Sequence, residues 1–302
     1  MPVETIDGVN IAYETRGEGR PLVFLHCWTG NKAFYFEQVA RFSRDYRCIC
    51  LDFPGHGDSG ECEEYSVENF GELTAELLRR LGVDQAVFAG HSLGGIVALY
   101  LALEHPDMVE GLILLDTTSY LSQTIFQRIF ALAAVFFGTI GYELSRTGFR
   151  HMKGLVAGIA ATHPLATPQS RLITARECSK VSNYSMARTL NNARKFNVTQ
   201  RLGEIEAPAM VVVGTGDMLA DVRHAKVLAR GLENSTITVV HGAGHMALFE
   251  KPEVVNEAIE VFLKRVYPAG AAGAKRVAKK PAKKPAKKKA ARKPAGNSRA
   301  PV

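Results

Sequence analysis

Apolar residues along this chain form two kinds of run. Near the start they alternate with polar residues, over Val3–Ile6 and again over 10–14, on either side of Asp7-Gly8. Alternation around an Asp-Gly pair predicts an antiparallel hairpin at the edge of a sheet. Further along the runs become continuously apolar, which predicts strands covered on both faces. These runs are 22–25, 48–51, 85–89, 109–115, 210–213 and 236–240.

Segments with apolar residues at helical spacing separate these strands. One begins at Ser66, repeats leucine at positions 73, 77, 78 and 81, and stops at Gly82, a residue that favours the end of a helix. Strands that alternate with helices indicate an α/β protein with a mostly parallel, doubly wound sheet. The other predicted helices are 32–42, 96–104, 225–229 and 252–266.

The alternation fails between residues 117 and 199, where the pattern is mostly helical with breaks at glycine and proline. This predicts a helical cap inserted into the sheet domain. Its apolar run 129–142 is too short to span a bilayer. Five apolar side chains in the cap recur at helical spacing and predict either an apolar lining for a substrate or packing of the cap onto the sheet. They are Ile125, Ile129, Leu132, Phe136 and Phe137.

Charge is distributed unevenly along the 302 residues. The formal net charge is +7, but residues 269–302 hold nine Lys and three Arg with no acid. The rest of the chain therefore has 25 basic and 30 acidic residues and is net negative. Lysine, alanine and proline cannot form a core, and repulsion among the lysines keeps such a segment extended. The sequence therefore predicts one folded domain, 1–268, with its cap at about 117–199, and a disordered basic tail, 269–302.

The basic residues of Lys275–Arg299 suggest a nucleic acid or another polyanion as partner. An acidic membrane surface and a merely solubilising appendage are the alternatives.

The N-terminal residues have no basic stretch followed by an apolar one, so we expect no secretory signal and a cytoplasmic location. Five cysteines form neither a Cys-x-x-Cys pair nor a cluster with zinc spacing. We expect reduced thiols, no bound metal and no cofactor. The oligomeric state stays open.

A candidate nucleophile follows the strand 85–89. The pattern Gly90-x-Ser92-x-Gly94 between a strand and a helix is typical of a nucleophile elbow, a turn so tight that the flanking positions must lack side chains. The alternative is an ordinary glycine-rich turn whose serine caps the helix.

A serine hydroxyl needs a histidine base, and the imidazole needs an acid that fixes its tautomer. His245 follows the predicted strand 236–240, and Asp217 follows the predicted strand 210–213. Asp116 also ends a predicted strand and is the alternative acid. We favour Asp217.

Together these features resemble the α/β-hydrolase family over roughly residues 2–267. The resemblance rests on Gly90-His91-Ser92-Leu93-Gly94-Gly95, on Gly-x-x-Asp ending at Asp217, and on Gly-x-Gly-His ending at His245. The loop Asp52-Phe53-Pro54-Gly55-His56-Gly57-Asp58-Ser59 also matches, and we interpret it, His56 included, as structural support.

The resemblance further implies an oxyanion hole made by the backbone N–H groups of Trp28 and Leu93. It makes Gly90, Gly94, His26 and His91 supporting residues. The family usually has glycine where this chain has Cys27, so we expect Cys27 to adopt backbone angles that suit glycine better.

A serine in the elbow favours acyl chemistry, since dehalogenases and epoxide hydrolases of this fold have aspartate there. We therefore expect a serine hydrolase that cleaves a carboxylic ester, thioester or lactone of a small to medium apolar acyl group through an acyl-enzyme. A C–C bond hydrolase, an acyltransferase and a protein that binds anions through its tail remain as alternatives.

Overall fold

The computed structural model describes residues 1–121, 161–164 and 166–268. They belong to one unit of the chain, Met1–Gly270. At its centre is an eight-stranded sheet with the order β1-β2-β4-β3-β5-β6-β7-β8. Its strands are β1 (Val3–Ile6), β2 (Val9–Arg16), β3 (Arg20–Leu25), β4 (Tyr46–Leu51), β5 (Ala86–His91), β6 (Val109–Leu115), β7 (Ala209–Gly214) and β8 (Ser235–Val240).

Six neighbouring strands, from β4 to β8 in the sheet order, run parallel to one another. β1 and β2 form the antiparallel hairpin predicted around Asp7-Gly8, and β2 pairs antiparallel with β4. The predicted α/β class with a mostly parallel sheet is therefore confirmed. Because the carboxyl ends of parallel strands share one edge, loops that follow different strands meet there.

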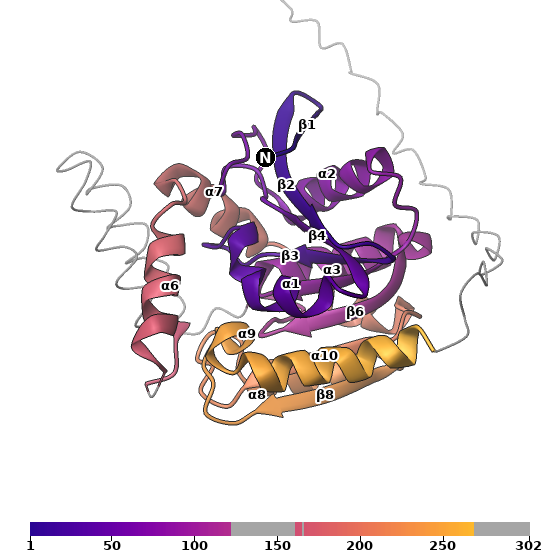
Figure 1. Cartoon of the computed structure of the whole chain (residues 1–302), viewed down its shortest axis with the longest axis vertical. Coiled ribbons are helices and arrows are strands. Elements are labelled where there is room, and N and C mark those ends of the chain that lie inside the picture. The colour runs from indigo at the N-terminus through magenta and orange to yellow at the C-terminus, as the bar shows by residue number, and fades with distance from the viewer. Residues whose placement is uncertain (122–160, 165, 269–302) are drawn as a thin grey trace, which may run out of the picture. The chain divides into compact units, whose positions relative to one another are not determined.

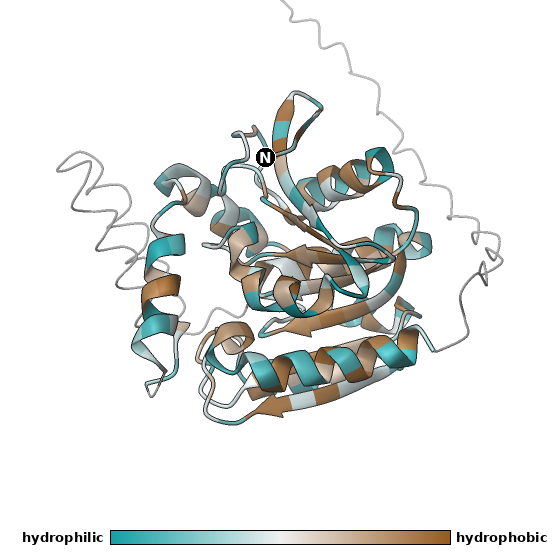
Figure 2. Ribbon diagram, viewed as in Figure 1, coloured by the Kyte–Doolittle hydropathy of each residue, from teal (hydrophilic) through white to brown (hydrophobic). Residues whose placement is uncertain are grey.

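Helices cover both faces of the sheet (Figure 1), and alternate strand residues point to the two faces. In β3, Val23 and Leu25 pack with helices α2, α3 and α8, whereas Leu22 and Phe24 pack with α1, α9 and α10. Figure 2 shows the strands mostly brown and the helices mixed in colour, as an enclosed sheet requires. The helices are α1 (Phe36–Phe42), α2 (Val67–Arg80), α3 (Leu93–Glu104), α6 (Pro168–Cys178), α7 (Asn183–Ala193), α8 (Val222–Gly231), α9 (Ala247–Glu250) and α10 (Pro252–Val266), with 3₁₀ turns η1 (Lys32–Tyr35), η2 (Pro106–Met108) and η3 (Thr199–Glu204).

Side-chain caps explain where several helices begin. Ser66 accepts a hydrogen bond from the Asn69 amide at the start of α2, as the sequence pattern predicts. The predicted helix 32–42 is instead divided, because the Asn31 side chain caps the 3₁₀ turn η1 before α1 begins. The four-residue helix α9 was not predicted, since one turn carries no periodic signal.

The described part of the predicted cap contains α6 and α7. Thr167 and Ser182 cap them by accepting hydrogen bonds from the amides of Ser170 and Ser185. The apolar run 129–142, the five apolar residues of the predicted lining and the tail 269–302 lie outside the described residues. Within the described ranges, no helix combines the length and hydropathy needed to cross a bilayer.

Candidate active site

Ser92 lies between the end of β5 and the start of α3 in a strained turn. Its φ of 53° and ψ of −114° are angles that residues with side chains rarely adopt. The turn closes because its flanks are glycine: a Cβ on Gly90 would lie 2.4 Å from the Gly94 carbonyl oxygen, and one on Gly94 would lie 1.9 Å from that of Leu25. The Ser92 amide donates to the Leu115 carbonyl (2.9 Å), which fastens the turn to β6.

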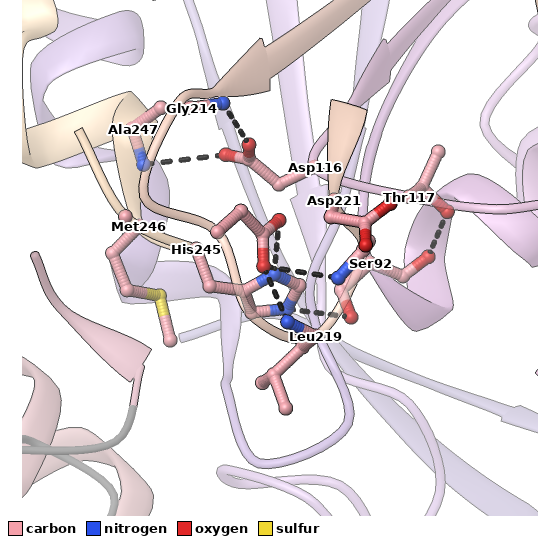
Figure 3. A network of polar contacts seen from close by, with 12 residues as sticks. Ser92, Asp116, Thr117, Gly214, Leu219, Asp221, His245, Met246 and Ala247 are labelled. Carbon is pink, nitrogen blue, oxygen red and sulfur yellow. Dashed lines mark hydrogen bonds and ion pairs between the residues drawn. The ribbon is translucent and has the colours of Figure 1, made fainter. Parts of the chain in front are cut away.

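His245 and Asp217 meet Ser92 at the carboxyl edge of the sheet. The Nε2 atom of His245 is 3.0 Å from Ser92 Oγ, and its Nδ1 atom is 2.8 Å from Asp217 Oδ2. Figure 3 shows the His245 ring directed at Ser92. Since a carboxylate only accepts, Nδ1 carries the proton, and Nε2 is free to accept a proton from the serine hydroxyl.

The Asp217 carboxylate is buried but well supplied with donors. Its Oδ1 atom accepts from the amides of Leu219 (2.7 Å) and Ala220 (2.9 Å), and the side chain is inaccessible to solvent. Burial by itself raises the pKa of Asp217, but the charge and hydrogen bond of His245, together with the amides of Ala220 and Leu219, outweigh it, and the pKa falls below its ordinary value. Asp217 is thus held as an anion beside the imidazole.

Asp116, the alternative acid, makes different contacts. Its carboxylate accepts from the amides of Gly214 (2.9 Å) and Ala247 (3.2 Å) (Figure 3). Burial, together with the negative charge of Asp217, raises the pKa of Asp116 well above its ordinary value. The structure therefore places Asp217, not Asp116, in hydrogen-bond contact with His245.

The loop after β3 lies next to the turn of Ser92, since Leu25 contacts Gly94 there. Within the described residues, neither the Trp28 amide nor the Leu93 amide donates a hydrogen bond. The Trp28 indole N–H donates to the Met186 carbonyl of α7 (2.7 Å), so the cap holds this loop. Positive φ among the described non-glycine residues occurs at Asp7, Ser92 and Asp116. The expectation of glycine-like angles at Cys27 is therefore wrong.

Two buried histidines brace the loop after β3. His26 Nε2 accepts from the Phe53 amide (2.9 Å), so its Nδ1–H donates to the Cys27 carbonyl (2.8 Å). His56 Nε2 lies 2.7 Å from the Trp28 carbonyl oxygen. Burial lowers the pKa of both imidazoles. Through these contacts His26 and His56 hold the backbone of the loop at Cys27 and Trp28.

His91 precedes the serine and contacts the backbone of His245. Its Nε2 atom lies 2.7 Å from the His245 carbonyl oxygen, to which it donates. Burial, with the nearby charge of His245, lowers the pKa of His91 to about 3. A neutral His91 therefore holds the backbone of His245.

Two further observations concern metals and thiols. Among the described residues, no group of three or more His, Cys, Asp and Glu side chains is arranged to hold a metal ion. All five cysteines are free thiols.

The sequence matches the alpha/beta hydrolase fold family over residues 20–252, and the protein belongs to that family. An uncharacterized hydrolase of Bacillus subtilis, YugF, is 30% identical over 269 residues, covering 86% of this chain and 96% of that protein. The 3-oxoadipate enol-lactonase 2 of Acinetobacter baylyi is 26% identical, over 86% of this chain and 96% of that protein. The structure of Est816, an N-acyl homoserine lactone degrading enzyme, superposes with a TM-score of 0.74 at 26% identity, over 86% of this chain and all of that one. The protein is thus an enzyme of the hydrolase class.

Sequence reasoning did not find Glu250 or Ala161, which contact the loop of His245. The Glu250 carboxylate accepts from the amides of Gly244 and Met246, and the Ala161 carbonyl accepts from the amide of His245. These are bonds to main-chain groups, and the pattern of apolar and polar residues does not encode them.

Proposed function

We propose that the protein is a serine hydrolase that cleaves a carboxylic ester or lactone through an acyl-enzyme. The observation that carries this proposal is the chain of hydrogen bonds from Ser92 Oγ through His245 to Asp217. A buried acid, a base of fixed tautomer and a serine on a strained turn form an arrangement that activates a hydroxyl.

In the proposed reaction, Ser92 Oγ attacks the acyl carbon while His245 Nε2 takes the hydroxyl proton. Asp217 stabilises the imidazolium that forms. The free N–H groups of Trp28 and Leu93 would bind the oxyanion. The imidazolium then gives its proton to the departing alcohol, and a water molecule, deprotonated by His245, releases the acid and restores Ser92.

The relatives support an ester or lactone as the bond cleaved, because an enol-lactonase and a lactone-degrading enzyme are among them. Both share about a quarter of their residues with this chain. We propose a small to medium apolar acyl group, since the apolar residues 125–137 of the sequence fall in the proposed cap, 117–199. Thioesters, C–C bonds beside a ketone and acyl transfer to an acceptor other than water are the alternatives.

Labelling with a fluorophosphonate, followed by assay on esters and lactones of increasing chain length, tests this proposal. The parent should be labelled, and Ser92→Ala should lose labelling and at least about 10³-fold in kcat while staying folded. Retained turnover without the hydroxyl would contradict the assignment. Since each buried methylene contributes about 0.8 kcal/mol, kcat/KM should rise with chain length and then fall. A flat profile would contradict an apolar pocket.

We further propose that the basic tail, 269–302, binds a polyanion independently of the domain 1–268. Twelve positive charges without an acid support this proposal. The absence of aromatic residues in the tail favours contact with a phosphate backbone over base stacking. The free thiols fit the reducing cytoplasm, which we propose as the location.

A further inference from the structure

The backbone of the loop that carries His245 is held at three successive residues. The amides of Gly244 and Met246 donate to one oxygen of Glu250, Oε1, at 3.2 and 3.3 Å. The His245 amide between them donates to the carbonyl of Ala161 at 2.8 Å. The side chain of His245 is therefore carried on a main chain whose position depends on the carboxylate of the turn that follows it and on a carbonyl from a distant segment.

The second oxygen of Glu250 faces the segment of the cap that precedes α6. Its Oε2 atom accepts from the His163 amide at 2.9 Å. The His163 carbonyl in turn accepts from Arg171 of α6 at 3.3 Å, and Ser170 of α6 donates to the Phe249 carbonyl of α9 at 3.3 Å. Glu250 thus joins the loop of His245 to a segment that α6 also holds.

Glu250 is half-buried in a place that a carboxylate does not favour by itself, since burial raises its pKa above the ordinary value. It lies in the single turn of α9, and its carboxylate accepts from the amide of Met246 at the start of that turn, where the helix dipole favours negative charge. Three backbone N–H donors compensate for the cost of burial. Space near the loop is tight as well, since a Cβ on Gly244 would lie 2.4 Å from the His163 amide nitrogen.

We propose that Glu250 is a positioning residue for His245, which couples the cap segment at His163 to the orientation of the imidazole. This inference rests on the proposed function, because it concerns the base of that reaction. A shift of the 161–163 segment changes the position of the carboxylate, and the amides on both sides of His245 follow it. Seating of the cap therefore orients the base.

Variants of Glu250 separate the contacts of its two carboxylate oxygens. Glu250→Ala removes the contacts of both oxygens, and Glu250→Asp keeps the charge on a side chain that is one methylene shorter. Glu250→Gln keeps one carbonyl oxygen for Gly244 and Met246 but sets an NH₂ group against the His163 amide. Glu253→Ala on the exposed face of α10 is the control for loss of a nearby charge.

The readouts are the rate of fluorophosphonate labelling and the downfield proton resonance of His245 Nδ1–H. We expect labelling to fall about 10- to 100-fold in Glu250→Ala and Glu250→Asp, with the resonance shifted or broadened, since small displacements of a base cost this much. Glu250→Gln, which keeps the acceptor for Gly244 and Met246 but loses the bond from His163, should fall between the parent and Glu250→Ala. Glu253→Ala should not differ from the parent.

Labelling within twofold of the parent in a folded Glu250→Ala or Glu250→Asp protein, with an unchanged resonance, would overturn the inference. Should the alanine variant not fold, the aspartate variant decides by the same criterion. Failure of the proposed function looks different: the parent would not be labelled, or Ser92→Ala would be labelled equally. The resonance still reports the placement of His245 in that case.

Discussion

The Asp116 carboxylate accepts a hydrogen bond from the Ala247 amide, with Oδ2 and N 3.2 Å apart, and so joins the end of β6 to the residue two places beyond His245. Its other oxygen accepts from Gly214 at the end of β7. Asp116 therefore supports the loops of Asp217 and His245 without touching the imidazole. Two acids that look alike in sequence occupy different positions in the site.

Replacing each aspartate with asparagine distinguishes the roles of the two acids. Asp217→Asn should lower kcat by about 10²- to 10⁴-fold, because the imidazole loses the acceptor that fixes its tautomer. Asp116→Asn should cost less than tenfold in kcat but about 1–3 kcal/mol in the free energy of unfolding, since its NH₂ group faces an amide donor. Steady-state kinetics and denaturant titration measure both effects. A larger kinetic loss in Asp116→Asn would make Asp116 the acid.

The buried histidines predict how stability depends on pH. The pKa of His91 is about 3 in the folded protein and 6.5 in the unfolded chain, so the unfolded chain binds the extra proton between these values. The stabilisation is complete above about pH 6.5 and falls by about 1.4 kcal/mol per pH unit below it. His26 and His56, whose pKa values burial also lowers, add to the slope.

Glutamine at position 91 tests this dependence, because its amide can still donate to the His245 carbonyl but does not titrate. The free energy of unfolding of His91→Gln, measured between pH 4 and 6.5, should show a slope smaller by about one proton. Equal slopes for the parent and the variant would mean that His91 titrates normally.

Gly94→Ala should prevent the turn of Ser92 from closing. The added Cβ would meet the Leu25 carbonyl oxygen at 1.9 Å and that of His26 at 2.9 Å, and both are backbone atoms. We expect a loss of about 3 kcal/mol or more in the free energy of unfolding. Gly203→Ala is the matched control, since nothing lies within 4 Å of its Cβ position. Thermal melting of the two variants gives the comparison, and equal stabilities would refute the steric argument.

Truncation after Tyr267 tests the tail. Full-length protein should bind duplex DNA without sequence preference, with about 4–8 phosphates neutralised and a log–log salt slope near −0.9 for each. The truncated protein should not bind, and its ester hydrolysis should be unchanged. Electrophoretic shifts with DNA, polyphosphate and anionic vesicles at low and high salt distinguish the partners. No shift at low salt would make the tail a solubilising appendage, and binding by the truncated protein would place the site in the domain.

The sequence predicted the elements whose pattern extends over several turns or a whole strand. Strand 85–89 and helix 252–266 are examples, and they correspond to β5 and α10. β5 extends to His91, because that residue pairs with Leu115 of β6. Such pairing depends on a partner strand, which a local pattern does not contain.

Contacts that depend on the path of the folded loops explain what the sequence left open. Asp116 and Asp217 both follow apolar strands, and only the path of each loop decides which carboxylate reaches His245. Glu250 sits in an unremarkable stretch of helical sequence, yet its carboxylate turns back to the amides of Gly244 and Met246. Hydrogen bonds between a side chain and the main chain do not affect the spacing of apolar residues, so that spacing cannot predict them.

Two residues of the inserted cap, one at its start and one inside it, each bond to one member of the proposed triad. Thr117 donates from Oγ1 to the Ser92 carbonyl (2.6 Å), and Ala161 accepts from the His245 amide (2.8 Å). Anyone who grafts part of a relative's cap onto this sheet should therefore exchange residues between these anchors only, after residue 121 and before residue 161. A graft that also replaced Thr117 and Ala161 would change the hydrogen bonds that hold Ser92 and His245. Its effect on catalysis could then not be separated from the change in specificity.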